Sequence, residues 1–366
     1  MTDTRRPPSH SISAGAPSQA VVDLSALSRN VSFLRDQAGG ADVMAVVKAD
    51  AYRHGASRCA LHLEPEVHSF AVATVAEGVS LRKAGIQKEI LVFGVPEEAV
   101  ANTFSQWGLT ASISTPEQLK LLPEGTRAHL HIDTGMNRTG LPIEDLNRFL
   151  DALTENPSLS VCGVYSHFAT AEDPGSKIVH EQYNRFMDAR SRFPSDWVTH
   201  ICNTGAVLHY PELKSLDLIR PGIGLTGYAP GKTVCQALNP VLEWRSRIVE
   251  VRHVKKGTPV SYGGTWIADR SGYVATIPVG YADGVPRILS NHLLVQAGKR
   301  MRPVVGSITM DFCMAWLGST PLPTGTLVTL LGGEGWGAGR WALEADSIPH
   351  EILCNLTTRV ERVYRD

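Results

Sequence analysis

A lysine at the end of an apolar run is the first residue of this chain whose surroundings suit covalent chemistry. The β-branched run 45–47 ends in Lys48, and the turn-forming segment 49–55 follows at once. A lysine in a half-apolar pocket loses its proton more readily, because burial penalises the ammonium form, and its free amine can form a Schiff base with a carbonyl. The alternative is a solvated lysine that ends an edge strand.

Four further groups of polar residues also follow directly after β-rich runs. They are 133–138, His167, Asn203 with Thr204, and 220–222. In a (β/α)8 barrel the carboxyl ends of all strands share one face, so residues more than a hundred positions apart meet there. We therefore expect these groups to lie with Lys48 around one mouth.

The elements that must position these residues have the pattern of repeated βα units. From Val21 onward, short β-rich runs alternate with longer amphipathic runs, and Thr115-Pro116-Glu117 and Pro142-Ile143-Glu144 are typical helix starts. Eight such units close a barrel. The eight expected strands centre on Val43–Val47, Phe70–Val72, Ile90–Phe93, Thr110–Ile113, Ala128–Ile132, Cys162–Tyr165, Val198–Ile201 and Leu216–Ile219.

The pattern changes after about Gly231, where short strand-like runs are separated by glycine and proline. These runs predict a separate all-β domain. They are 242–254, 273–277, 293–296, 301–305 and 327–331. The expected organisation is a disordered leader at 1–18, a (β/α)8 TIM-type barrel at 19–232 and a β-domain at 233–366.

Composition restricts the kind of partner. The 366 residues carry a net charge of −1, which favours neither nucleic acid nor a membrane surface over a small molecule. The leader has no apolar core of a signal peptide, and no run of about 18 apolar residues occurs. Six scattered cysteines without metal-ligand spacing indicate reduced thiols in a cytoplasmic protein and no metal site.

Eight motifs, in order over nearly the whole chain after the leader, resemble those of the bacterial alanine racemases. That family consists of enzymes that bind pyridoxal 5'-phosphate (PLP) and combine a barrel with a β-domain. The resemblance implies interconversion of L- and D-alanine, which supplies D-alanine for peptidoglycan. The motifs are AVVKADAYRHG (45–55), HIDTGMNRTG (131–140), YSHFATAED (165–173), IRPGIGLTGY (219–228), SYGGTW (261–266), VGYADG (279–284), VGSITMDF (305–312) and RVERVY (359–364).

The resemblance implies two proton-transfer bases on opposite faces of the substrate. Lys48 would hold PLP as a Schiff base and serve D-alanine, and Tyr262 would serve L-alanine. A free tyrosine titrates near pH 10, so a tyrosine that acts near pH 7 needs roughly 4 kcal/mol of stabilisation of its phenolate. The family pattern offers Arg220 bonded to His167, and His167 reaching Tyr262. For His167, a satisfied core histidine is the alternative reading.

The resemblance also assigns residues to the cofactor. Arg220, which has only donors and stays charged, would face the pyridine nitrogen and leave it unprotonated. The phosphate needs several hydrogen bonds, and glycine at 222 allows close approach of the backbone, although a simple turn glycine is the alternative. Thr204 replaces an expected serine and keeps the hydroxyl. The expected cofactor-binding residues are Lys48, Tyr52, His167, Asn203, Thr204, Arg220, Gly222, Ile223 and Tyr364.

Substrate binding and assembly follow from the same resemblance. Arg138 would face the substrate carboxylate, Tyr281 would line the entrance, and Met310 and Asp311 would enter the site with Tyr262 from the partner subunit of a homodimer. His131 stands where many family members have a lysine that becomes carbamylated and braces the arginine. We expect Arg138 to be held another way, by Asp133 or a bound anion.

Other activities compete with this interpretation. A broader amino-acid or serine racemase is one alternative. Serine differs from alanine by one hydroxyl, and a small pocket discriminates between two such substrates by only about 1–3 kcal/mol. A barrel-type PLP decarboxylase is another, but its glycine-rich phosphate loop and late cysteine-aspartate motif are not found. A non-catalytic PLP-binding protein could share the barrel and its lysine, whereas residues 232–366 and the Tyr262 motif argue against it.

Overall fold

The computed structural model describes residues 12, 15–156, 159–231, 233–332 and 336–366. The chain divides into two compact units, which we treat separately. One is Leu24–Val241, and the other joins the described part of residues 1–23 to Leu242–Asp366. Most of the expected leader at 1–18 lies outside the described residues.

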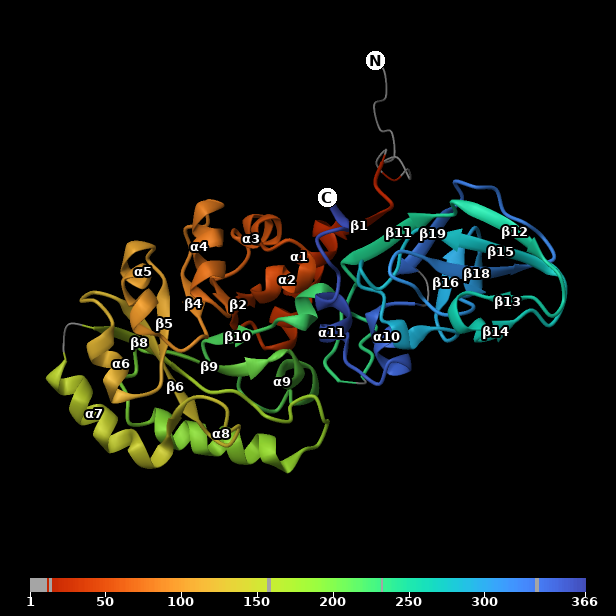
Figure 1. Cartoon of the computed structure of the whole chain (residues 1–366). Coiled ribbons are helices and arrows are strands. Elements are labelled where there is room, and N and C mark those ends of the chain that lie inside the picture. Colours follow the sequence, from red (N-terminus) through yellow and green to blue (C-terminus); the bar gives the residue numbers. More distant parts are fainter. Residues whose placement is uncertain (1–11, 13–14, 157–158, 232, 333–335) are drawn as a thin grey trace, which may run out of the picture. The chain divides into compact units, whose positions relative to one another are not determined.

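Leu24–Val241 forms a closed barrel of eight parallel strands, which confirms the predicted fold class (Figure 1). Each strand pairs with the next, and the last pairs back with the first through Leu218 opposite Asp42. The strands are almost wholly buried, as expected where one face lines the barrel and the other lies under helices. They are β2 (Asp42–Val46), β3 (Ser69–Val72), β4 (Ile90–Val92), β5 (Thr110–Ile113), β6 (Arg127–Asp133), β8 (Ser160–Tyr165), β9 (Val198–Asn203) and β10 (Leu218–Arg220).

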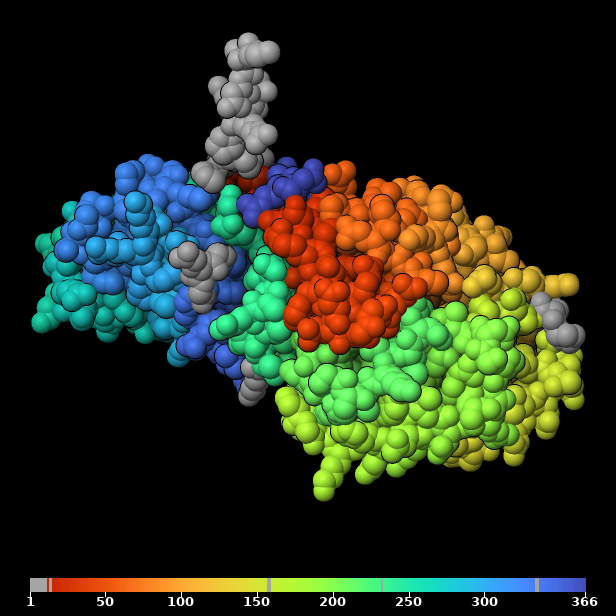
Figure 2. All heavy atoms as spheres, turned by 180° about the vertical axis from the view of Figure 1, so that it is seen from behind, coloured from red at the N-terminus to blue at the C-terminus, as the bar shows by residue number. Residues whose placement is uncertain are grey.

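The helices of this unit connect successive strands. They are α1 (Leu24–Gln37), α2 (Lys48–Arg53), α3 (Ala56–Leu63), α4 (Val75–Lys83), α5 (Ala101–Gln106), α6 (Pro116–Leu121), α7 (Leu146–Glu155), α8 (Lys177–Arg190) and α9 (Thr204–His209). Short 3₁₀ turns η1 (Glu98–Val100), η2 (Ile143–Asp145) and η3 (Ile223–Thr226) and the two-residue strand β7 (Leu141–Pro142) complete the unit. Figure 2 shows α1 in red beside the green segments that contain α9 and η3, where the first and last parts of the barrel meet.

Local signals in the sequence explain where some helices begin. α6 starts at the expected proline, and Thr115 and Gln118 form a capping box around its first turn. The second expected start, at Pro142, opens as the 3₁₀ turn η2 before α7. Among the described residues, no helix has the length and apolar composition needed to cross a membrane.

The second unit is β-rich. Its largest sheet has the strand order β17-β16-β19-β11-β1-β20, and β12-β15-β18 and β13-β14 form two smaller sheets. The turns η4 (Tyr262–Gly264) and η5 (Arg287–Leu289) lie between strands. The strands are β1 (Ser18–Asp23), β11 (Leu242–Arg247), β12 (Glu250–Val254), β13 (Pro259–Val260), β14 (Trp266–Ile267), β15 (Gly272–Ile277), β16 (Leu294–Ala297), β17 (Arg300–Pro303), β18 (Cys313–Gly318), β19 (Leu327–Leu331) and β20 (Glu361–Arg365).

The observed division of the chain differs from the expected limits at 19 and 232. Strand β1 pairs with β11 and β20, so the first described strand belongs to the β-rich unit. That unit also contains helices α10 (Ala338–Glu344) and α11 (Pro349–Cys354) and strand β18, none of which was among the expected elements. The short runs of the sequence predicted a β-rich unit but could not show which distant strand would complete its sheet.

Candidate active site

Lys48 directly follows β2 at the carboxyl end of the barrel and is half-buried. The backbone after it is left-handed from Ala49 to Arg53, with φ between 51° and 67° at five consecutive non-glycine residues. Each such residue costs roughly 1–2 kcal/mol relative to a right-handed one. A turn of this kind persists only where its surroundings hold it, and such strain gathers at functional sites.

Side chains from inside and outside the turn hold it. The Glu77 carboxylate accepts a hydrogen bond from the amide of Ala49 at 2.6 Å. The Asp50 carboxylate accepts one from the amide of Ala56 at 2.7 Å, and the buried His54 ring contacts the carbonyl oxygens of Ala51 and Tyr52 through Nδ1. These bonds fix the backbone that carries Lys48 and Tyr52.

A cradle of small groups lies beside the turn. The Thr204 hydroxyl accepts hydrogen bonds from the amides of Gly222 at 3.2 Å and Gly224 at 3.3 Å. With both lone pairs in use, its proton remains to be donated elsewhere. A Cβ at position 222 would overlap the phenolic oxygen of Tyr52, so glycine is required there. Hydroxyls and closely approaching amides of this kind suit a phosphate group.

Two more of the predicted cofactor residues frame this cradle. The Asn203 side chain caps α9 by accepting a hydrogen bond from the amide of Ala206 at 3.0 Å, which fixes Thr204 as the first helical residue. Ile223 is buried and opens η3. With Lys48 nearby in the fold, the cradle fits PLP: an amine for its aldehyde and hydrogen-bond donors for its phosphate.

Arg220 ends β10 and is only 3% exposed. Its terminal nitrogen Nη1 donates to His200 Nδ1 at 2.9 Å, and Nη2 donates to the Ser166 carbonyl at 2.7 Å and to His167 Nδ1 at 3.1 Å. Its guanidinium also lies 5.2 Å from the centre of the Tyr165 ring. Burial lowers the pKa of Arg220 to about 10, so the group remains a cation at neutral pH.

His167 is held as a neutral imidazole. Burial lowers its pKa well below the ordinary value, and the positive charges of Arg220, Arg138 and Lys48 act in the same direction. Because an arginine can only donate, Nδ1 of His167 must be the acceptor of the Arg220 bond. The ring proton therefore lies on Nε2, which is a hydrogen-bond donor.

Two further buried histidines continue this chain of bonds through the barrel. His200 accepts from Arg220 at Nδ1, so its Nε2 carries the proton and donates to His129 Nδ1 at 2.9 Å. His129 Nε2 lies 3.2 Å from a Glu89 carboxylate oxygen. Burial acts to raise the pKa of Glu89, but the hydrogen bond with His129 and the charge of Arg127 outweigh it and bring the pKa to about 2.

His131, at the position expected to brace Arg138, does something else. Its ring stacks flat on Tyr165, with ring centres 4.4 Å apart and planes 3° apart. Burial, Arg220 and Arg138 lower the pKa of His131 to about 3, although Asp133 opposes them. A neutral imidazole supplies no negative charge to Arg138.

Asp133 positions Arg138 through the backbone. Its carboxylate accepts hydrogen bonds from the amides of Gly135 at 2.8 Å, Met136 at 2.9 Å and Asn137 at 2.9 Å. This closes the loop after β6 and leaves the Arg138 side chain exposed. An exposed guanidinium at a barrel mouth is available for a carboxylate.

The remaining predicted residues lie on the β-rich unit. Tyr262 is 76% exposed, and Met310 and Tyr281 are also exposed. Amides on the Tyr281 loop donate to the carbonyls of Thr309 and Met310, so the two loops lie together. Asp311 forms an ion pair with Arg359 at 2.9 Å. Tyr364 lies in β20, opposite Val22 of β1.

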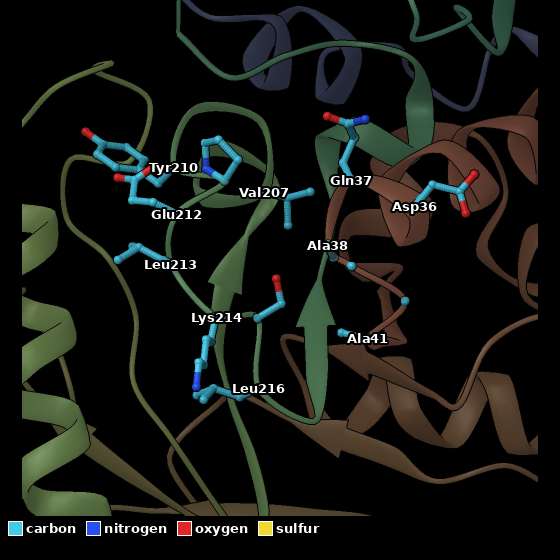
Figure 3. Close-up of a pocket in the computed structure, with 14 residues that line it drawn as sticks. Asp36, Gln37, Ala38, Ala41, Val207, Tyr210, Glu212, Leu213, Lys214 and Leu216 are labelled. Carbon is cyan, nitrogen blue, oxygen red and sulfur yellow. The ribbon is translucent and has the colours of Figure 1, made fainter.

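A separate cavity of about 660 Å³ lies at the other end of the barrel (Figure 3). The segments 36–41 and 210–216, which precede β2 and β10, form most of its lining. None of the predicted site residues lines it. Barrel enzymes place catalysis at the carboxyl ends of their strands, so the cavity at the opposite end is not our candidate site.

The sequence reasoning missed several residues that the structure connects to Arg220. Tyr165 and His200 contact it, and buried His129 and half-buried Glu89 continue the contacts beyond His200. One signal was available in β6, whose alternation places His129 and His131 on the same side of the strand. Two histidines on the inner side of an apolar strand indicate a polar barrel interior. Glu89 and His200 gave no comparable signal.

Comparisons with known proteins agree with this architecture. The family "Alanine racemase, N-terminal domain" matches residues 22–230, and "Alanine racemase, C-terminal domain" matches 241–364. The alanine racemase of Nostoc sp. is 37% identical over 93% of this chain and 94% of its own length, and that of Geobacter sulfurreducens is 37% identical over 95% and 97%.

Solved structures give the same result. The crystal structure of alanine racemase from E. faecalis superposes with a TM-score of 0.90 at 28% identity, over 97% of this chain and 100% of that one. The Bartonella henselae alanine racemase "with covalently bound pyridoxal phosphate" has a TM-score of 0.87 at 26% identity, over 95% and 99%. From both domain matches and relatives that span nearly its whole length, this chain belongs to the alanine racemase family of isomerases.

Proposed function

We propose that this chain is a PLP-dependent racemase that interconverts L- and D-alanine by a two-base mechanism, with Lys48 and Tyr262 as the bases. The observation that carries the proposal is the neutral His167, held by the buried Arg220 at the same barrel mouth as Lys48. The Bartonella relative with its covalently bound cofactor supports the assignment of PLP.

Residues of the barrel mouth would hold the cofactor. Lys48 would bind it covalently, and the phosphate would take hydrogen bonds from the hydroxyls of Thr204 and Tyr52 and from the backbone amide of Ile223, with Gly222 leaving room for its close approach. When bound, PLP supplies an electron sink that makes the α-proton of an amino acid removable. Tyr364 is assigned to the same pocket by the family resemblance.

Arg220 would keep the pyridine nitrogen unprotonated. Its terminal nitrogens already donate to His200, His167 and backbone carbonyls, which leaves Nε–H as the donor that we assign to the ring. Arginine has only donors and keeps its proton, so a ring nitrogen that faces it must accept a hydrogen bond and cannot carry a proton of its own. With the nitrogen unprotonated, the bound group would supply a weaker electron sink, which would favour return of a proton over other reactions.

Tyr262 would act from the partner subunit of a homodimer. The 76% exposure of its side chain leaves it without the enclosed surroundings that a phenolate base needs, so a second surface must cover it. We assign that surface to the barrel mouth of the partner, where Nε2–H of His167 can donate to the phenolate. Inversion requires bases on both faces, and Tyr262 would remove the proton of L-alanine while Lys48 would serve D-alanine.

Substrate selection would rest on one cation and several bulky side chains. Arg138 would bind the carboxylate, and Tyr281, Met310 and Asp311 would narrow the space for the side chain. A pocket of this kind accepts a methyl group and discriminates against serine by only about 1–3 kcal/mol, so serine is a minor substrate. D-alanine made in the cytoplasm would serve peptidoglycan synthesis.

The test is to incubate the purified PLP-loaded protein with L-alanine in deuterated water. We expect optical rotation to decay to zero and deuterium to appear at Cα of both enantiomers, together with visible absorbance from the bound cofactor. Cofactor absorbance without exchange or loss of rotation would contradict the racemase and support a non-catalytic PLP-binding protein.

A further inference from the structure

Helix α8 presents one polar residue on its inner face. The buried residues of the helix are Val179, Gln182, Phe186 and Ala189, a stripe at helical spacing that is otherwise apolar. Gln182 has no exposed surface. A glutamine buried in an apolar stripe carries a desolvation cost that only satisfied hydrogen bonds offset.

Gln182 bonds to segments that follow two different barrel strands. Its Oε1 accepts from the amide of Ala169 at 2.9 Å, and its Nε2 donates to the carbonyl of His167 at 3.0 Å. Nε2 also lies 3.3 Å from the Thr134 hydroxyl, which bonds to the Ser166 hydroxyl at 2.8 Å. The amide group of Gln182 therefore links the segment after β6 to residues 166–169 after β8.

The segment that carries His167 is thus held from two sides. Arg220 donates to the Ser166 carbonyl and the His167 ring from within the barrel, and Gln182 bonds to the His167 carbonyl and the Ala169 amide from α8. The ring nitrogen of His167 can face Arg220 only while its backbone stays in place. A buried network of this kind is rigid when every member is satisfied.

We propose that Gln182 is a positioning residue of the racemase: by clasping residues 167–169, it orients the His167 ring toward Arg220 and toward the Tyr262 base. This inference rests on the proposed function, because it assigns Gln182 an effect on the proton transfer made by Tyr262. It predicts a selective defect on that transfer and little effect on the transfer made by Lys48.

The chain offers a matched control in Gln118. This glutamine is also buried, and its Oε1 accepts from the amides of Ser114 at 2.6 Å and Thr115 at 3.2 Å after β5. Gln182→Met and Gln118→Met each replace a buried carboxamide, which accepts a hydrogen bond from a loop amide, by an apolar side chain of similar size. Only the first removes a bond to His167.

The experiment measures kcat/KM of both holoenzymes with α-protonated and α-deuterated L- and D-alanine. The two enantiomers have equal free energies, so kcat/KM must fall equally for both, and we expect a fall of about 10- to 100-fold in Gln182→Met. The α-deuterium effect should rise with L-alanine and fall with D-alanine, because the transfer at Tyr262 becomes more rate-limiting. Gln118→Met should leave both isotope effects unchanged.

A readout that needs no catalysis comes from the cofactor-free protein. We expect the ring ¹⁵N resonances of His167 to show one tautomer in the wild type and an average of two in Gln182→Met, with Gln118→Met like the wild type. Unchanged isotope effects in Gln182→Met, or identical changes in both variants, would overturn the proposal. If Gln182→Met does not fold, Gln182→Glu, which keeps an acceptor for Ala169, is measured in the same way and by the same criteria.

The two hypotheses fail differently. Absence of racemisation by the wild type would refute the proposed function, whereas wild-type activity with symmetric isotope effects in Gln182→Met would refute only the role of Gln182. A rise with D-alanine and a fall with L-alanine would keep the positioning role and exchange the enantiomers assigned to Tyr262 and Lys48.

Discussion

The mouth of the barrel and the exposed face of the β-rich unit differ in how far their side chains are buried and hydrogen-bonded within their own unit. Around Arg220, which is 3% exposed, every terminal nitrogen of the guanidinium has a hydrogen-bond partner within the same unit. On the β-rich unit, Tyr262 is 76% exposed, and Tyr281, Met310 and Phe312 are exposed as well. Large aromatic and apolar side chains gathered on a surface mark a site of interaction.

This difference separates the two proposed bases. The lysine side has its conformation fixed by contacts within the barrel, down to the left-handed turn after Lys48. On the tyrosine side, the hydroxyls of Ser261 and Ser307 donate hydrogen bonds across the two loops, but the Tyr262 phenol is exposed. Contacts within the barrel thus hold one proposed base, whereas we propose that a partner subunit covers the other.

The largest effect is expected from Lys48→Ala. Loss of the amine removes both the covalent hold on PLP and one base, so racemisation should fall by at least about 10,000-fold. Polarimetry and the absorbance of the bound cofactor measure the two losses. Lys83→Ala, on the outer helix α4, is the control and should behave like the wild type. Retention of more than a hundredth of the activity would show that Lys48 is not the base.

Tyr262→Phe should lower racemisation by about 1,000-fold, the size of a general acid–base contribution. Its phenol is exposed in the single chain, so thermal unfolding of the barrel should not change. Tyr273→Phe, in β15 of the same unit, serves as the control and should keep full activity. Unchanged activity of Tyr262→Phe would remove the two-base mechanism.

A smaller effect, on PLP affinity, is expected from removing the Thr204 hydroxyl at the barrel mouth. Thr204→Val keeps the shape but loses the hydroxyl, and a hydrogen bond to a charged group contributes about 1.5–3 kcal/mol, so PLP affinity should fall by about 10- to 100-fold. Thr204→Ser restores the hydroxyl and should bind within about threefold of the wild type. Equal affinities of the valine and serine variants, measured by cofactor absorbance, would exclude Thr204 from the phosphate site.

The last prediction concerns how the free energy of unfolding depends on pH through the neutral His131. The pKa of His131 is about 3 in the fold and that of a free histidine is near 6.5, so the unfolded chain binds more protons between these values. Stability should therefore fall as pH decreases below about 6.5, by up to about 1.4 kcal/mol per pH unit for this group. His131→Phe, which keeps a ring on Tyr165, should reduce the slope of unfolding free energy against pH. An identical slope would contradict a depressed pKa at His131.

The barrel was predictable from sequence because its strands are short β-rich runs that alternate with longer amphipathic runs. All eight expected strands overlap observed ones. In the β-rich unit, β18 was missed because Met314 and Ala315 weaken its β pattern, and α10 was missed because it is only 7 residues long. The place of β1 depends on pairing with residues more than 200 positions away, which no local pattern contains.

The site was predictable only where residue type limits the chemistry. Lys48, His167 and Arg220 stood out because each follows an expected strand and matches a family motif. The left-handed turn was not predictable, since segment 49–53 contains no glycine to signal it. The contacts from Arg220 through His200 and His129 to Glu89 also required the structure. A buried histidine has the same sequence signature whether it packs against apolar groups or joins a polar network.

Mixing two inactive variants shows whether Tyr262 completes the site of a partner subunit. Lys48→Ala and Tyr262→Phe proteins are unfolded together, refolded with PLP and assayed for racemisation of L-alanine. A heterodimer with shared sites contains one site that lacks both bases and one site that is intact, so about a quarter of the wild-type activity should return. If Tyr262 served its own subunit, every site would lack one base and no activity would return.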